Sequence, residues 1–200
     1  MPTIVLILGE DPVSTAGTHP PFPEHLFPDN CTLRGGGSML ARAIITARRL
    51  MGFIIPVDPW QIARTLGLDV ETLPLGSIDG LLKRDGDGAW YVIVSSLLPN
   101  DRQRFTVAHE IGHWLLHRGS REAFAHAGPQ TGRYEREANT FAAELLMPHN
   151  AFLEAVWELN ADVGQLARRF GTSREATLLR LKQFGFGQYA IEPTEELIPF

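Results

Sequence analysis

The stretch RFTVAHEIGHWLLHR, residues 104–118, constrains the fold more than any other, because histidines recur in it at every fourth position. Residues four apart lie one turn above another on a helix, so this spacing predicts a helix with imidazoles on one side. Apolar residues between the histidines can face a core; they are Val107, Ile111 and Leu115. Gly112 permits a close neighbour. We therefore expect a second element packed tightly against this helix.

The pair His109 and His113, with Glu110 beside the first, forms an HExxH pattern. In zinc hydrolases two neutral imidazoles of this spacing hold the metal, and the glutamate acts on the attacking water. A third protein ligand is needed. The segment YEREANTFAAELLMP, residues 134–148, is predicted to be helical and offers Glu135. Asn139, one turn further on, is placed to orient a ligand histidine without binding the metal itself.

Glu137 is the competing third ligand. It points about 200° away from Glu135 on a helical wheel, so the two carboxylates cannot both face one metal. We favour Glu135, and expect Glu137 and Glu144 to be solvated or structural.

The remaining histidines receive a different interpretation. His117 lies about 12 Å of helix rise from His109, too far for one ion to bind both, so we expect it to interact with the helix end and its dipole. His126 and His149 are expected in loops or at the surface. Either is a candidate for stabilising an oxyanion, and the sequence does not choose between them.

Residues 1–37 differ in composition from the rest, with six of the fourteen prolines and a closing Gly-Gly-Gly. This favours a flexible arm. The single cysteine, Cys31, excludes an intrachain disulfide and indicates a reducing compartment. An incidental thiol is the simpler interpretation of Cys31; the alternative is a thiolate that covers the open position of the metal. No apolar run reaches the roughly 20 residues that cross a bilayer, so we expect a cytoplasmic protein without a membrane segment.

The rest of the chain predicts an α+β fold. We expect a metallopeptidase domain over 38–160, two helices over 161–185 and a tail over 186–200. The first domain should be mostly helical, with a helix from Ser38, another beginning at Asp58-Pro59, and a loop over 120–132. A small antiparallel sheet is expected from about 70 to 95, with a hairpin turn at the Asp-Gly pairs of 85–88. WYVIVSS is the expected edge strand, where a substrate would add as a further strand.

The segment LARRFGTSREATLLRLKQFG, residues 166–185, has the pattern of a helix-turn-helix, with a turn at Gly171 and Thr172 as the expected cap. Between 162 and 185 five basic residues face two acidic ones. This fits direct DNA binding through 162–185 or the solvated face of a structural pair. The second helix shows few base-reading side chains, which favours the structural interpretation. The net charge of −5 argues against nonspecific nucleic-acid binding by the whole chain.

These motifs, in this order, resemble the ImmA/IrrE family of metallopeptidases over about residues 38–185. The resemblance implies a gluzincin-like, zincin-type core in which His109, His113 and Glu135 bind the metal and Glu110 is the catalytic residue. Asn139 fits the Asp or Asn of the family pattern. Members commonly cleave helix-turn-helix repressors, so the implied partner is such a repressor. Residues 1–37 lie outside this resemblance. Zn²⁺ is the default for this ligand set, and Mn²⁺ or Fe²⁺ also suit it.

Three functions compete at this stage. The first is a metal-dependent endopeptidase that relieves transcriptional repression by cutting a regulatory protein. The second is a DNA-binding or adaptor protein with a structural or vestigial metal site, and the third is a toxin–antitoxin component. Glu110 favours the first over the second, because a structural site needs a fourth ligand and has no need for a carboxylate beside the first histidine.

Overall fold

The computed structural model describes residues 42–44, 46–47, 54–117, 123–125 and 132–191. The predicted arm with Cys31, most of the helix predicted from Ser38, and His126 lie outside the described residues. Within that first helix, 42–44 and 46–47 are helical, and Ala43 and Ala47 are buried in the core.

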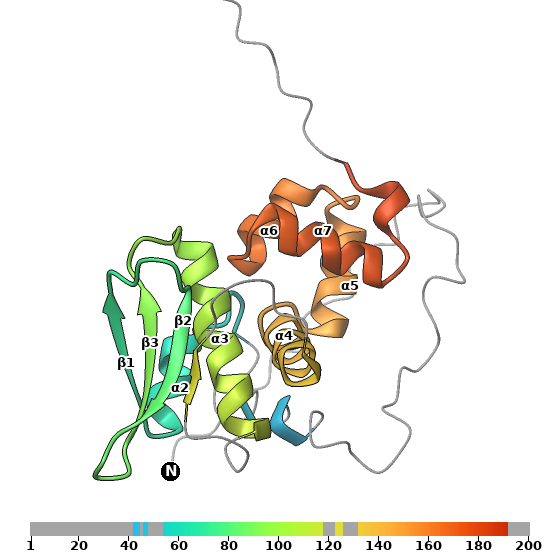
Figure 1. Cartoon of the computed structure of the whole chain (residues 1–200). Helices are drawn as coiled ribbons and strands as arrows, with labels where there is room; N and C mark the ends of the chain where they lie inside the picture. Colours follow the sequence, from blue (N-terminus) through green and yellow to red (C-terminus); the bar gives the residue numbers. More distant parts are fainter. Residues whose placement is uncertain (1–41, 45, 48–53, 118–122, 126–131, 192–200) are drawn as a thin grey trace, which may run out of the picture.

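A four-stranded sheet forms one side of the molecule (Figure 1). Its strands are β1 (Leu68–Leu73), β2 (Gly80–Arg84), β3 (Trp90–Ser95) and β4 (Ala123–Ala125), in the order β1-β3-β2-β4. The strand β4 falls where a loop was predicted.

The prediction of an antiparallel sheet was wrong, because β1 runs parallel to β3 while β2 is antiparallel to both β3 and β4. After β1 the chain turns back to form β2, and the β2–β3 hairpin then inserts β3 between β2 and β1. The segment WYVIVSS is therefore an inner strand with neighbours on both sides. Its backbone is already paired, so it cannot receive a substrate strand, and that prediction is also corrected.

The Asp-Gly pairs form the β2–β3 turn as predicted. Asp85 and Asp87 side chains accept hydrogen bonds from the backbone N–H groups of Gly86 and Ala89, both at 2.9 Å. Gly88 has a φ of 92°, a backbone conformation that glycine adopts without a steric penalty.

Helices α2 (Pro59–Thr65), α3 (Asn100–His117) and α4 (Arg133–Leu146) share a core with the sheet. Asp58 caps α2 by accepting from the N–H groups of Trp60 and Gln61, as its sequence predicted. Figure 1 shows α3 lying beside the sheet, with α4 next to α3 on the other side. The contact between α3 and α4 is close at Gly112, where an added Cβ would lie 3.2 Å from Ala138 Cα.

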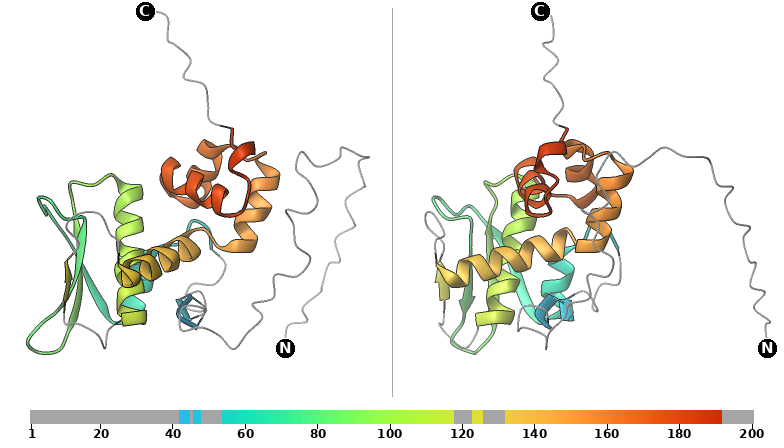
Figure 2. Two further views of the ribbon diagram at one scale, coloured as in Figure 1. Left: turned by 45° about the vertical axis from the view of Figure 1, so that its right-hand side comes forward. Right: turned by 90° about the vertical axis from the view of Figure 1, so that its right-hand side faces the viewer.

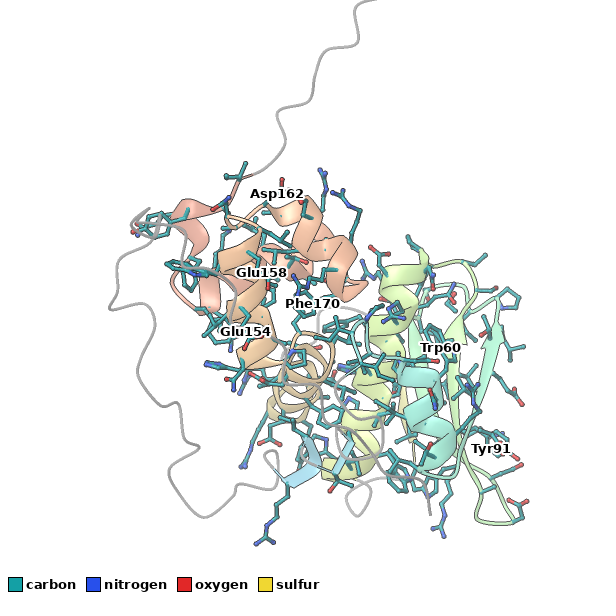
Figure 3. All side chains as sticks on the ribbon, turned by 180° about the vertical axis from the view of Figure 1, so that it is seen from behind. Trp60, Tyr91, Glu154, Glu158, Asp162 and Phe170 are labelled. Carbon is teal, nitrogen blue, oxygen red and sulfur yellow. The ribbon has the colours of Figure 1, made fainter. Side chains whose placement is uncertain are left out.

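A second cluster of buried residues holds the C-terminal helices together. These are α5 (His149–Glu158), α6 (Val163–Phe170) and α7 (Arg174–Gln183), followed by the short 3-10 helix η2 (Gly187–Tyr189). Figure 2 shows this group stacked at one end of α4, and Figure 3 shows Phe170 inside it, with Trp60 and Tyr91 in the sheet half. Phe186 is fully buried in this cluster, so the chain stays packed beyond the point where a tail was expected.

The turn between α6 and α7 departs from the predicted cap. Gly171 adopts a left-handed conformation with φ 63°, which ends α6 as expected. Ser173, not Thr172, caps α7 by accepting from the N–H of Ala176. Thr172 is buried, and its hydroxyl hydrogen-bonds the Thr177 hydroxyl at 2.9 Å instead of capping the helix.

Arg104 joins the two halves of the molecule. From α3 it donates to the carbonyl oxygens of Gly171, at 2.9 Å, and of Val57. Burial lowers the pKa of its guanidinium, although Asp58 opposes that effect. Among the described residues, no helix combines the length and the apolar composition that crossing a bilayer requires.

Candidate metal centre

Three side chains from α3 and α4 converge on one point. The Nε2 atoms of His109 and His113 are 3.0 Å apart. A Glu135 carboxylate oxygen lies 3.3 Å from His109 Nε2, and the other lies 3.4 Å from His113 Nε2. Both imidazoles are buried and Glu135 is mostly so. The sequence predicted this set, and the structure brings all three together.

The distances fit a small divalent cation. Bonds of 2.0–2.1 Å in a tetrahedral site place neighbouring ligand atoms about 3.3–3.4 Å apart, close to the separations that link Glu135 to the two histidines. Two imidazole nitrogens and a carboxylate are also the donor set that borderline metals such as zinc prefer. The described residues therefore fit the metal that the HExxH pattern implies.

Asn139, which the sequence analysis placed beside a candidate ligand histidine, contacts His109. Its Oδ1 lies 2.9 Å from His109 Nδ1. Because a carbonyl oxygen only accepts, Nδ1 carries the hydrogen, and the lone pair of Nε2 points toward His113 and Glu135. One helix, α4, thus supplies both a candidate ligand and the side chain that orients another.

His117 makes contacts that the sequence analysis did not predict. It does lie at the end of α3, but its ring is buried and faces His113, with 3.2 Å between their Nδ1 atoms. Its Nε2 lies 2.9 Å from Glu137 Oε2. The i, i+4 spacing from His113 to His117 was visible in the sequence, and that signal alone predicts that the two rings can meet.

Glu137 does not join the three converging side chains, in agreement with the helical-wheel argument. It is one of the two expected structural carboxylates. Its Oε1 accepts from Arg133 Nε at 2.8 Å and its Oε2 faces His117. The hydrogen bond from Arg133, followed by that from His117, lowers the pKa of Glu137 below its usual value. His149 lies elsewhere, with its ring against Phe184 on the second cluster.

Glu110 borders a cleft of about 880 Å³ that His109 also lines. The cleft runs between the start of β2 and α3 on one side and α7 on the other. Glu110 is fully buried, and a Cβ added to Gly80 would lie 3.5 Å from its Oε1. The backbone of Gly80 packs closely here, because the same added Cβ would lie only 2.5 Å from Thr106 Cγ2. Of the three converging side chains, His109 lines this cleft together with Glu110.

Helix α7 forms the far wall of the cleft. Leu179 is 60% exposed there, which gives the wall an apolar contact. Arg180 instead points inward, with 1% of its side chain exposed, and binds Glu144 Oε1 at 2.6 Å and the Met147 carbonyl oxygen at 3.0 Å. Burial lowers the pKa of Arg180, while Glu144 opposes this. Arg180 is one of the five basic residues of 162–185, and because it is buried against Glu144 it cannot contact DNA. Helix α7 faces the cleft.

Residues 63–182 match the model of the IrrE N-terminal-like domain. The chain is 30% identical over 118 residues to an uncharacterized immunity region protein of Bacillus phage phi105, covering 58% of this chain and 72% of that protein. It is 30% identical over 126 residues to the radiation response metalloprotease IrrE of Deinococcus radiodurans. That match covers 58% of this chain but only 37% of the Deinococcus protein.

A solved structure described as a Mycobacterium tuberculosis transcriptional regulator is similar in fold. The TM-score is 0.52 at 20% sequence identity, over 70% of this chain and 46% of that one.

Proposed function

The chain belongs to the ImmA/IrrE family of metallopeptidases, and we propose that it is a metal-dependent endopeptidase that cuts a regulatory protein. The proposed substrate is a helix-turn-helix repressor, and its cleavage relieves transcriptional repression in the cytoplasm. The observation that carries the proposal is the convergence of His109, His113 and Glu135 beside Glu110, at the edge of a cleft large enough for a peptide segment.

Each residue has a chemical role in this proposal. His109, His113 and Glu135 hold a divalent metal in a zincin-like site, with Zn²⁺ as the default and Mn²⁺ or Fe²⁺ as alternatives. A bound divalent cation supplies Lewis acidity, which polarises the scissile carbonyl and makes water easier to deprotonate. Glu110 accepts the proton of the attacking water and then delivers it to the leaving amine. Asn139 holds His109 in the tautomer whose Nε2 is free of hydrogen.

The phage relative supports the regulatory side of the proposal, since it is described as an immunity region protein. The exposed Leu179 on α7 would contact an apolar side chain of the substrate. In this scheme the helices of 162–185 form a substrate-docking wall rather than a DNA-reading element.

The test is co-expression with the repressor whose gene lies nearest, followed by measurement of the repressor's intact mass. Glu110→Gln keeps the volume of the side chain but removes the base, so cleavage should fall by about 10²–10⁴-fold while metal binding persists. Glu154→Gln, at an exposed position on α5, is the matched control and should cleave normally. Equal cleavage by the Glu110→Gln protein would exclude Glu110 as the base. A metal-loaded protein that cuts nothing would indicate a binding role.

A further inference from the structure

A continuous hydrogen-bonded path leads from the surface of α4 to one of the candidate metal ligands. Arg133 donates to Glu137 Oε1, Glu137 Oε2 faces His117 Nε2 at 2.9 Å, and His117 Nδ1 faces His113 Nδ1 at 3.2 Å. The exposed fraction of the side chain falls along this path, from 33% at Glu137 to 3% at His117 and none at His113.

The Glu137 carboxylate determines which ring nitrogen carries the hydrogen in His117 and in His113. Arg133 donates to Glu137 Oε1 at 2.8 Å, and a carboxylate paired with a guanidinium in this way offers only acceptors. His117 Nε2 must then donate, which leaves the lone pair of His117 Nδ1 facing His113. His113 in turn donates from Nδ1, and its Nε2 is left without a hydrogen. Donation in the opposite direction, from His117 to His113, would place the hydrogen on His113 Nε2, which faces Glu135.

We propose that His117 and Glu137 are positioning residues that fix the ring and tautomer of His113, so that its Nε2 is presented to the metal. This inference rests on the proposed metal site and deepens it. Each ligand histidine then has its own orienting partner from α4: Asn139 acts on His109 directly, and Glu137 acts on His113 through His117. Mutating a residue that hydrogen-bonds a ligand histidine typically weakens metal binding about 10–100-fold.

The simpler alternative is that His117 is a buried histidine whose hydrogen bonds stabilise the fold and do not affect the metal site. The two interpretations differ in what happens to His113 when His117 changes. A merely satisfied His117 contributes to folding stability alone, whereas a positioning His117 also determines which nitrogen of His113 carries hydrogen. The tautomer of His113 in the metal-free protein is therefore the decisive observation.

The experiment uses the full-length protein with Zn²⁺ as the only ligand. His117→Phe keeps a ring of similar size but has no acceptor for His113, and His117→Gln restores a carbonyl oxygen. Glu137→Ala removes the outer carboxylate from a partly exposed position, so it tests the path even if the His117→Phe protein fails to fold. His149→Phe is the control for a histidine replaced outside the site. Zinc affinity is measured by competition with a chelator, and ring tautomers by ¹⁵N NMR of metal-free protein.

We expect the zinc dissociation constant to rise about 10–100-fold in His117→Phe and Glu137→Ala, and less in His117→Gln. His113 should carry its hydrogen on Nδ1 in the wild type. In His117→Phe and Glu137→Ala it should be a mixture of the two tautomers. Zinc affinity within twofold of wild type, with His113 unchanged, would overturn the inference while leaving the metal site in place. Failure of the wild-type protein itself to bind zinc would refute the proposed function as well.

Discussion

Replacing Gly112 by alanine tests how closely α4 must approach the helix that carries the two histidines. The added methyl carbon would lie 3.0 Å from Phe141 Cδ1, 3.2 Å from Ala138 Cα and 3.3 Å from Ala138 O. Carbon atoms prefer separations of about 3.5–4.0 Å. Two of the three neighbours are backbone atoms, so no rotation of a side chain relieves the contact, and α4 has to move by several tenths of an ångström.

Two opposing effects set the magnitude. In an uncrowded helix, glycine to alanine stabilises a protein by about 0.4–1 kcal/mol, because the unfolded chain loses freedom. Overpacking a close contact costs about 1–3 kcal/mol. The net result for Gly112→Ala should be a loss on the order of 1 kcal/mol, or about 2–4 °C in Tm for a chain of this size. Ala138 precedes Asn139, so the shift of α4 also disturbs the hydrogen bond to His109, and zinc affinity should fall.

Gly164→Ala is the matched control, because Gly164 is also helical but its nearest neighbour is the end of a flexible side chain, Arg174 Nη2 at 3.0 Å. This variant should be neutral or slightly more stable. Urea unfolding of the metal-free proteins, followed by circular dichroism, gives the stability, and a zinc titration gives the affinity. If Gly112→Ala stabilises the protein as much as Gly164→Ala does and binds zinc normally, the close α3–α4 contact does not govern the site.

Three further outcomes follow from other contacts. Zn²⁺ at a free concentration 100 times its dissociation constant should stabilise the wild type by about 2.7 kcal/mol, an effect that a chelator reverses and Glu135→Ala abolishes in a thermal melt. Glu144→Ala should destabilise the fold by on the order of 3 kcal/mol in urea, because it leaves the buried Arg180 without its carboxylate; an unchanged midpoint would contradict this. Asp162→Ala should cost about 1 kcal/mol at pH 7, because the side chain caps α6. Hydrogen bonds from Gln165 lower the pKa of Asp162, so its contribution is present above the ordinary carboxyl pKa of 3.8 and is lost as the pH falls through the folded value. A penalty that stays constant down to pH 3 would contradict that assignment.

The sequence predicted best where a local pattern determines a local geometry. The four-residue spacing of His109 and His113 places both rings on one face of a helix, and the same reasoning joined Glu135 to Asn139. Asp58 before proline and the Asp-Gly pairs likewise form their hydrogen bonds with residues at most three positions away. For these features the neighbours along the chain are also the neighbours in space.

Prediction failed where the partner is distant along the chain. The sequence of 68–95 does not indicate that β3 lies between β1 and β2. The strand order depends on which edge of β1 pairs with the β2–β3 hairpin, and local patterns do not determine that. The helical wheel excluded Glu137 from the metal but could not place it beside His117, since their meeting depends on how α3 crosses α4. Thr172, with Glu175 three residues later, fitted the pattern of a capping residue, but its hydroxyl bonds Thr177 inside the fold.

The cleft between the two halves has a consequence for the order in which the protein becomes competent during synthesis. The three side chains that converge on the candidate metal centre, and Asn139 beside them, have all been added by residue 139, whereas α7, the far wall of the cleft, ends at Gln183. At translation speeds of about 5–20 residues per second, that interval lasts on the order of 2–9 s. A nascent chain therefore contains the side chains of the candidate metal centre seconds before the far wall of the cleft has been synthesised.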